Sequence, residues 1–188
     1  MKIGERFKIK GFKNELSYLD ENTIIVHCYR KKWDKHYEVR IDAEDLPKII
    51  ERYSSISIRD RGNKWIYAIG VERKKYRNGK ANRNRLLHRF INNTPNHLQT
   101  DHINRNTLDN RKSNLRSVTN AQNSQNYGVS KKSKSGIRNV FWSKGLGKWR
   151  VMIQKDGKKH HFGYYDDINE AAKVAKQKRK ELFSYSTD

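Results

Sequence analysis

The residues that could do chemistry gather between positions 101 and 126, in the segment DHINRNTLDNRKSNLRSVTNAQNSQN. Asp101 and His102 open it, and asparagines follow at Asn114 and Asn123, twelve and then nine positions further along. Carboxylate and carboxamide oxygens are hard ligands that suit Mg²⁺, and a neutral histidine can accept a proton from water near pH 7. The pattern therefore favours a small metal site with a general base beside it.

Simpler interpretations of the segment compete with this one. An Asp-His pair is common at protein surfaces, and asparagine-rich loops often form turns, because asparagine tolerates the left-handed backbone conformation. A calcium loop that begins at Asp101 is excluded, since its third, fifth and twelfth positions would be Ile103, Arg105 and Lys112. The spacing of the polar residues, together with the words around them, favours a hydrolytic site.

These residues also resemble a known family. His102, Asn114 and Asn123 resemble the H, N and N of an HNH nuclease, and the words DHIN, LDNRKSNLR and TNAQNSQN are similar to its homing-endonuclease branch. The resemblance implies metal-dependent hydrolysis of phosphodiester bonds in duplex DNA, with nicking and cutting both open. It implies that His102 is the general base and that Asn114 positions the loop and the histidine. It also implies that Asp101 and Asn123 hold a divalent metal, Mg²⁺ first and Mn²⁺ as the alternative.

The composition favours a polyanionic partner. Lys and Arg total 42 against 20 Asp and Glu, a formal net charge of +22, and aromatic residues alternate with the basic ones. Because each neutralised phosphate releases condensed counterions, we expect double-stranded DNA as the partner, and neither a membrane nor a small-molecule substrate. We expect a monomer that acts in the cytoplasm of a prokaryotic host, with a phage or an intron as candidate source of the gene. The single cysteine, Cys28, excludes an internal disulfide and a thiolate zinc cluster.

The chain is predicted to be a modular α+β protein with a β-rich N-terminal segment. We assign residues 1–80 to this N-terminal module, 81–126 to a ββα-metal HNH nuclease, 127–136 to a basic linker and 137–188 to a DNA-binding domain. Strands are expected at 23–29, 36–41, 54–58 and 64–71, with turns or loops at 59–63 and 72–85, and a helix whose apolar stripe is Leu46, Ile49, Ile50 and Tyr53. The N-terminal module could be a DNA-contacting arm or a scaffold in front of the nuclease.

Short elements are expected around the HNH-like residues. A helix over 86–91 carries His88, for which a structural role is favoured over a catalytic one. Strands at 98–103 and 115–118 flank a polar loop, and Thr119 is suited to cap a helix over 120–126. Because adjacent strand residues face opposite sides, Asp101 could face a metal while His102 reaches an attacking water.

The last fifty residues form a module of their own. Strands are expected at 137–142, 148–154 and 158–165, packed on a helix that Asp166 or Asp167 caps, with Ile168, Ala171, Ala172, Ala175 and Leu182 along one stripe. The words SGIRNV, KWRVMI, FGYY and NEAAKVA resemble an APETALA2-type DNA-binding domain. The sequence departs from that family's plant pattern at Phe141 and Met152, which leaves the base preference open.

Six residues of this module are candidates for DNA contact. Strand alternation favours outward-facing Arg150 and Gln154, whose long polar side chains suit a major groove. The resemblance implies base or phosphate contacts for the other four, which are Arg138, Trp142, Lys159 and His161. We expect Trp149 to be a core residue and leave Trp142 open between core and contact.

Two other functional classes remain alternatives. A non-catalytic, sequence-specific DNA-binding regulator would use the C-terminal module and keep the central segment as a spacer. An RNA-directed or structure-specific nuclease would differ in its substrate, which a binding competition between duplex DNA, single strands and RNA would reveal.

Overall fold

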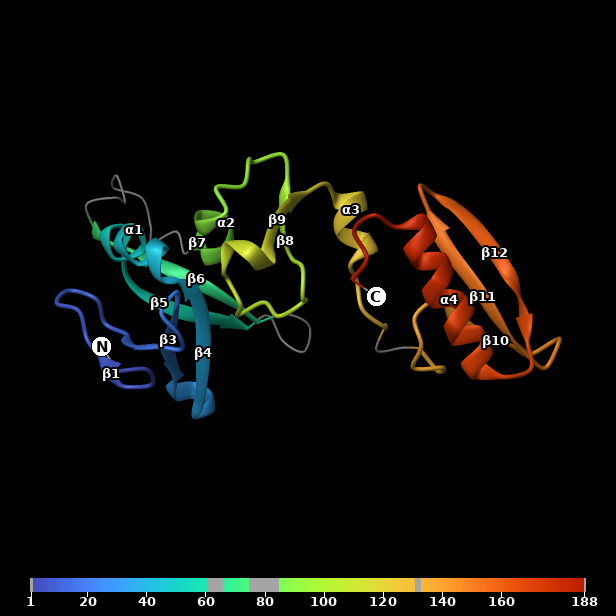
Figure 1. Cartoon of the computed structure of the whole chain (residues 1–188), viewed down its shortest axis with the longest axis horizontal. Coiled ribbons are helices and arrows are strands. Elements are labelled where there is room, and N and C mark those ends of the chain that lie inside the picture. Colours follow the sequence, from blue (N-terminus) through green and yellow to red (C-terminus); the bar gives the residue numbers. More distant parts are fainter. Residues whose placement is uncertain (1, 61–65, 75–84, 131–132, 188) are drawn as a thin grey trace. The chain divides into compact units, whose positions relative to one another are not determined.

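Small, largely antiparallel sheets and short helices make up the fold. The computed structural model describes residues 2–60, 66–74, 85–130 and 133–187, and Figure 1 labels their helices and strands. The chain divides into two compact units, residues 1–117 and 118–188. This mixture of helices and separate sheets agrees with the predicted α+β class. In the described part of the chain, no helix has the length and hydropathy of a membrane span.

A four-stranded sheet opens the first unit. Its strands follow chain order, and each pairs antiparallel with the next: β1 (Arg6–Phe7), β2 (Glu15–Tyr18), β3 (Thr23–Arg30) and β4 (Lys35–Asp42). The predicted strands at 23–29 and 36–41 are confirmed as β3 and β4. Val39 and Ile41 of β4 are buried and Tyr37 is half-buried, as their alternation indicated.

A helix and a second sheet follow. The 3-10 turn η2 (Ala43–Asp45) leads into α1 (Leu46–Arg52), and the sheet consists of β5 (Tyr53–Asp60), β6 (Ile66–Glu72) and β7 (Arg85–Leu86). Tyr53, expected on the helical stripe, is the first residue of β5 and remains fully buried. Pairing with Glu72 of β6 makes its backbone extended, and its ring packs edge-on against Phe90, with centroids 4.9 Å apart. The predicted turn at 59–63 and loop at 72–85 lie largely outside the described residues.

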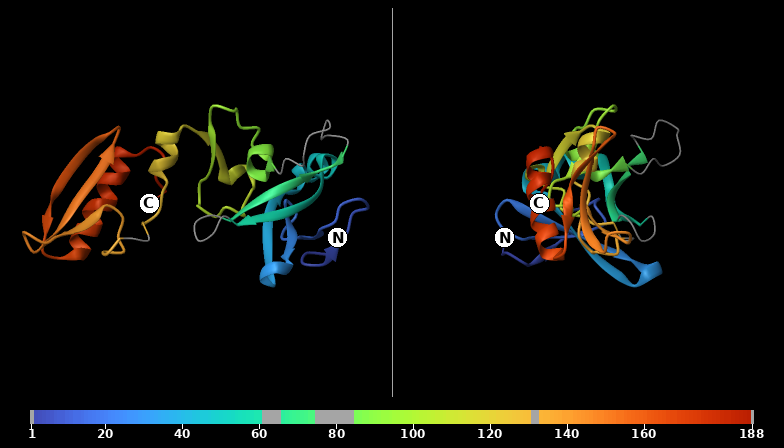
Figure 2. Two further views of the ribbon diagram at one scale, coloured as in Figure 1. Left: turned by 180° about the vertical axis from the view of Figure 1, so that it is seen from behind. Right: turned by 90° about the vertical axis from the view of Figure 1, so that its right-hand side faces the viewer.

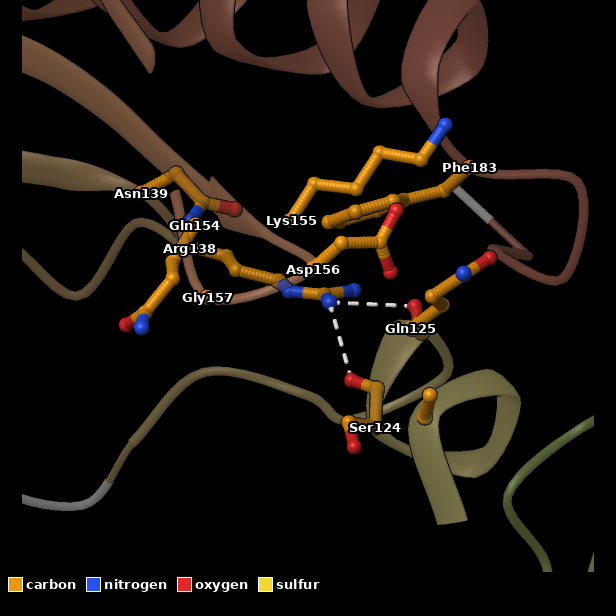
Figure 3. Close-up of a pocket in the computed structure, with 10 residues that line it drawn as sticks. Ser124, Gln125, Arg138, Asn139, Gln154, Lys155, Asp156, Gly157 and Phe183 are labelled. Atoms are coloured by element: carbon orange, nitrogen blue, oxygen red, sulfur yellow. Dashed lines mark hydrogen bonds between the residues drawn. The ribbon is translucent and has the colours of Figure 1, made fainter. Parts of the chain in front are cut away.

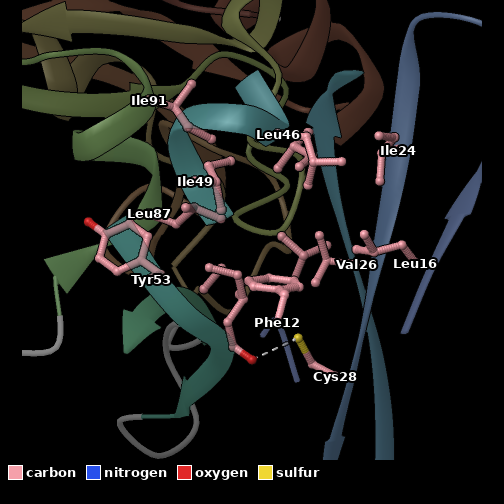
Figure 4. Packing of buried hydrophobic residues seen from close by; sticks show 14 of the residues in the cluster. Phe12, Leu16, Ile24, Val26, Cys28, Leu46, Ile49, Tyr53, Leu87 and Ile91 are labelled. Atoms are coloured by element: carbon pink, nitrogen blue, oxygen red, sulfur yellow. Dashed lines mark hydrogen bonds between the residues drawn. The ribbon is translucent and has the colours of Figure 1, made fainter. Parts of the chain in front are cut away.

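One apolar core joins the two sheets to the helix before the HNH-like residues. Leu16 and Val26 come from the first sheet, while Leu87 and Ile91 come from α2 (Leu87–Ile91) (Figure 4). Leu115 of β9 belongs to the same cluster. The segment expected to carry the nuclease is therefore built on the core of the N-terminal residues.

The elements around the HNH-like residues match their predicted order. They are β8 (Gln99–His102), the 3-10 turn η4 (Lys112–Asn114), β9 (Leu115–Val118) and α3 (Asn120–Gln125), while Leu86, expected in the preceding helix, belongs to β7. Thr119 caps α3 as predicted: its side chain accepts from Gln122 N, and the Gln122 side chain accepts from Thr119 N.

The second unit contains the predicted three-stranded antiparallel sheet on one helix. Figure 2 shows α4 (Ile168–Leu182) lying along the sheet of β10 (Val140–Ser143), β11 (Lys148–Lys155) and β12 (Lys158–Tyr165). Ala171 and Ala175 are fully buried, so the helix packs closely. The first strand begins at residue 140 rather than 137, because Asn139 is left-handed with φ of 67°. Asp167, one of the two expected caps, accepts from Asn169 N.

Gly70 of β6 tests how tightly the first core is packed. A Cβ atom at this position would lie 2.4 Å from Cε1 of Tyr53, whose ring is fully buried. We expect Gly70→Ala to lower the free energy of unfolding by about 1–3 kcal/mol, because the ring has no space to move into. Urea denaturation measures the change. Gly145→Ala is the matched control, since a Cβ there meets nothing within 4 Å, and equal stabilities of the two variants would contradict the expectation.

Candidate active site

His102 ends strand β8 in a buried aromatic environment. His102 is only 5% exposed to solvent. Its ring lies edge-on to His88, with centroids 4.9 Å apart at 74°, and 6.3 Å from the ring of Tyr67. Burial lowers the pKa of His102, although Asn110 and the charges of Asp101 and Asp109 favour the protonated form. The imidazole is therefore neutral at physiological pH, which is the form that accepts a proton.

His88 of α2 forms one wall of this environment. It is 4% exposed, and its pKa falls to about 3 because of burial and, next, the charges of His102 and Arg89. Its Nδ1 atom has no hydrogen-bond partner among the described residues. The sequence favoured a structural role for His88, and the structure adds that the ring it holds in place is that of His102.

The side chain of Asn114 closes the loop that follows His102. Its Oδ1 accepts from Asn104 N at 2.8 Å, and its Nδ2 donates to the Asp109 carbonyl at 2.8 Å. The Asn114 carbonyl accepts from Ile103 N, also at 2.8 Å. These three bonds fix the backbone on both sides of the loop, directly after His102. The contacts suit the positioning role that the family resemblance implies for Asn114.

The loop is also fastened to strand β4. Arg40 N donates to the Leu108 carbonyl at 2.9 Å, and Asn110 N donates to the Arg40 carbonyl at 2.8 Å. Asp109 is 1% exposed, and Arg111 binds both of its carboxylate oxygens, at 2.8 and 2.7 Å. Burial would raise the pKa of Asp109, but the hydrogen bonds and charge of Arg111 lower it overall. The loop is thus held by backbone pairing at its centre and by an ion pair beside it.

The buried carboxylate of Asp101 forms an ion pair with an arginine. Arg116 of β9 donates to Asp101 Oδ2 from Nε at 2.9 Å and from Nη2 at 2.7 Å, and Asp101 is 8% exposed. A guanidinium therefore neutralises the carboxylate that the sequence assigns to a metal. The sequence analysis missed Arg116. The available signal was a single basic residue in the strand LRSV, beside the predicted strand 98–103 that contains Asp101 and His102.

Asn123 lies half-buried on α3, in the second unit. The structure thus brings Asp101, His102 and Asn114 together in the first unit, and a joint role of Asn123 with Asp101 stays a prediction. Within the described ranges, no three His, Cys, Asp or Glu side chains gather as a metal-binding group. Tyr67, on β6, is a further neighbour of His102 that no sequence signal indicated.

The C-terminal sheet presents an open face to solvent. Cross-strand register pairs Arg150 with Phe141 and Tyr164, Met152 with His161, and Gln154 with Lys159, so these seven side chains share one face. Five of them are exposed and the other two, Arg150 and Met152, are half-buried: the exposed ones are Phe141, Gln154, Lys159, His161 and Tyr164. The intervening Val151 and Ile153 are buried on the other side, as predicted. Four predicted DNA contacts therefore lie on one basic and aromatic surface.

Trp142 lies on the opposite side of the sheet. It pairs in register with Trp149, and their ring centroids are 4.9 Å apart. Trp149 packs against the core beside α4, as expected, whereas Trp142 is 47% exposed at the end of the strand. The register separates Trp142 from the open face on which the other sheet candidates lie.

Arg138 makes contacts inside its own unit. Its Nη2 donates to the carbonyls of Gln125 at 3.0 Å and Ser124 at 3.4 Å, and its guanidinium lies 5.7 Å from the ring of Phe183 (Figure 3). Carbonyls at a helix C-terminus lack intrahelical partners, so Arg138 caps α3. Arg138, Gln154 and Phe183 are among the residues that line the adjoining cavity of about 460 Å³. The capping contacts give Arg138 a role that does not involve DNA.

Substitution of Asn114 tests the loop geometry. Asn114→Ala would leave the Asn104 N–H and the Asp109 carbonyl without their bonds, so we expect the free energy of unfolding to fall by about 2–4 kcal/mol. Asn114→Asp keeps an acceptor but loses the donor, and we expect an intermediate loss. Urea denaturation gives both values, with Asn96→Ala as the control at an exposed asparagine. A change of less than about 0.5 kcal/mol for Asn114→Ala would contradict the role given to the side chain.

Comparison with known proteins finds a family match that covers the residues around His102. Residues 92–125 match the model of a family described as HNH endonuclease. Protein 3.8 of Escherichia phage T7 is 32% identical over 80 residues, which are 43% of this chain and 66% of that protein, just under two thirds of its length. No solved structure is a significant match. The family match includes His102, Asn114 and Asn123 and supports the nuclease assignment of the segment.

Proposed function

We propose that the chain is a homing-type HNH endonuclease that hydrolyses phosphodiester bonds in duplex DNA with the help of a divalent metal. The observation that carries the proposal is the placement of His102, which is buried at the end of β8, next in sequence to Asp101 and against the ring of His88. The match of residues 92–125 to an HNH endonuclease model supports the same assignment. We infer DNA rather than RNA from the resemblances of both the nuclease segment and the C-terminal module.

His102 would act as the general base. A neutral imidazole removes a proton from the attacking water as the water approaches the phosphorus atom. Asn114 holds the backbone after His102, and His88 and Tyr67 limit the positions that the His102 ring can take. A base held in one position reacts without a reorganisation cost, so these neighbours contribute through orientation.

Asp101 and Asn123 would hold the metal, most simply Mg²⁺, with Mn²⁺ as an alternative. The fit depends on Asp101, whose buried carboxylate is a hard oxygen donor already paired with the guanidinium of Arg116, which a metal would have to share or displace. Hard oxygen donors suit Mg²⁺, which commonly keeps water and phosphate oxygens as its other ligands. When bound, the ion would supply positive charge to the developing phosphorane and to the leaving oxygen.

The C-terminal module would bind duplex DNA as an APETALA2-type domain. Its open face carries Arg150, Gln154, Lys159 and His161 on the neighbouring strands β11 and β12. A pair of strands can enter a major groove. Because this face lies on a separate unit, it would raise the local concentration of the nuclease on DNA. A relative in a phage supports a phage gene whose product acts in the cytoplasm of a prokaryotic host.

The cleavage assay tests the enzyme. We expect the wild-type chain to convert supercoiled plasmid that carries its own flanking DNA into nicked or linear product with Mg²⁺, and to form none with EDTA. His102→Ala should lower the rate by roughly two or more orders of magnitude, because the general base is lost. His97→Ala is the matched control, since His97 is an exposed histidine outside β8 and the loop that Asn114 closes, and its rate should equal that of the wild type.

Two results would overturn the proposal. Cleavage that His102→Ala retains would show that another group activates the water. Tight, salt-sensitive binding without any cleavage, in Mg²⁺ or Mn²⁺, would favour the DNA-binding regulator.

Arg150 tests the open face of the C-terminal sheet. We expect Arg150→Ala to weaken duplex binding by roughly tenfold, because one phosphate or base contact is lost. The slope of log affinity against log salt concentration should fall by about one. Fluorescence anisotropy in EDTA at several salt concentrations measures both effects. Lys176→Ala, at an exposed position of α4, should leave affinity close to that of the wild type. Equal losses for the two variants would contradict a contact role for this face.

A further inference from the structure

The hairpin between β3 and β4 ends in a strongly basic tip, which we define as residues 29–36. It contains Arg30, Lys31, Lys32 and Lys35 against one carboxylate, Asp34. The three lysines are exposed, and none forms an ion pair within the part of the chain that the structure describes. Two large aromatic side chains accompany them, Tyr29 at 52% and Trp33 at 38% exposure. Figures 1 and 2 show the tip projecting from the first unit.

The tip is held in one conformation. Asp34 is left-handed with φ of 46°, and its N–H donates to the Lys31 carbonyl at the end of the 3-10 turn η1 (Lys31–Trp33). The Tyr29 hydroxyl donates to Asp34 Oδ1 at 2.7 Å, and the Tyr29 ring lies 4.6 Å from that of His36. The guanidinium of Arg30 stacks 4.9 Å from the Trp33 ring. The lysines therefore extend from a rigid two-stranded ribbon.

The positive surface continues past the tip. A cavity of about 390 Å³ lies beside the hairpin, and the residues that line it include Arg6, Lys8, Lys13, Tyr29 and His36. Its one carboxylate, Glu15, is paired with Arg6 at 3.0 Å and Lys8 at 3.4 Å. Cations thus outnumber carboxylates at the base of the hairpin as well as at its tip.

Strand β4 connects this surface to the candidate active site. The strand begins at the tip with Lys35, and Arg40 pairs with the loop that Asn114 closes. Five residues of strand span roughly 16 Å, about the rise of five base pairs of duplex. About this length of strand therefore separates the tip from the loop that follows His102, which is less than one turn of DNA.

We propose that the basic hairpin tip is a second DNA-contacting surface, which binds the phosphates that border a groove of duplex DNA. A two-stranded ribbon fits a major groove, and exposed lysines at its tip could contact the phosphates on the border of that groove. Single strands are the poorer fit, because binding them relies on open aromatic faces, whereas the Tyr29 ring is tilted against that of His36 and Arg30 lies over the Trp33 ring. The choice of DNA as partner rests on the proposed function.

A charge-matched pair of triple variants tests the proposal. Lys31→Gln, Lys32→Gln and Lys35→Gln together remove three charges from the tip, while Lys173→Gln, Lys176→Gln and Lys180→Gln remove three from exposed positions of α4. Both variants of the full-length chain carry a net charge of +19 (22 − 3). Affinity for a duplex of about 30 base pairs is measured by anisotropy in EDTA, over a range of salt. We expect the tip variant to bind roughly tenfold or more weakly and to lose about 2.7 from its salt slope.

The salt slope of the helix variant should fall by less than a third of the loss expected for the tip variant. Equal losses for the two variants would overturn the proposal, because net charge alone would then explain them. A loss on single-stranded DNA or RNA that equals or exceeds the loss on duplex would also overturn it. Binding in EDTA needs no catalysis, so this experiment stands apart from the plasmid assay: absence of cleavage would leave its result interpretable as duplex binding.

Discussion

The carboxamide of Asn114 is the constraint on which the geometry around His102 depends. Its oxygen accepts from Asn104 N and its nitrogen donates to the Asp109 carbonyl, so one planar group ties the start and the middle of the loop to its end. A carboxylate offers no donor for this task, and an alkyl side chain offers neither group. Because Asn114 is buried, water does not compete for these bonds. Arg40 of β4 pairs with this loop at Asp109, so the loop is also attached to the first sheet.

Electrostatics oppose folding in this chain and favour its association with a polyanion. A formal net charge of +22 creates repulsion within the folded chain that bound phosphates would relieve. Two buried carboxylates are each paired with a cation: Asp101 with Arg116, and Asp109 with Arg111. In each pair the guanidinium compensates the cost of burying a carboxylate. At Asp101 this pairing means that a metal ion would have to share or replace a guanidinium, so metal affinity and the position of Arg116 are coupled.

The sequence predicted the local elements well and the shared core poorly. Alternation and capping signals located β3, β4, β9, β12 and the start of α3, because these depend on neighbouring residues. The burial of Leu87 and Leu115 in one cluster with Leu16 depends on contacts far apart in sequence, which periodicity does not encode. At the site, spacing indicated His102 and Asn114, whereas Arg116 and Tyr67 become neighbours only through strand pairing and sheet packing. The roles assigned to Asn123 and to the four-part domain division stay predictions.

The shared core has a functional consequence. The HNH-like segment is too short to bury an apolar core of its own, and it uses Leu115 to join one that β3 and β5 already form. The β3–β4 hairpin is therefore connected to the loop that follows His102 through packed side chains and the pairing of β4. If the hairpin tip contacts DNA, the strand that begins at this contact also pairs with the loop that follows His102. Recognition and catalysis would then share one rigid element, which explains why a nuclease segment this small is built on a larger β-rich scaffold.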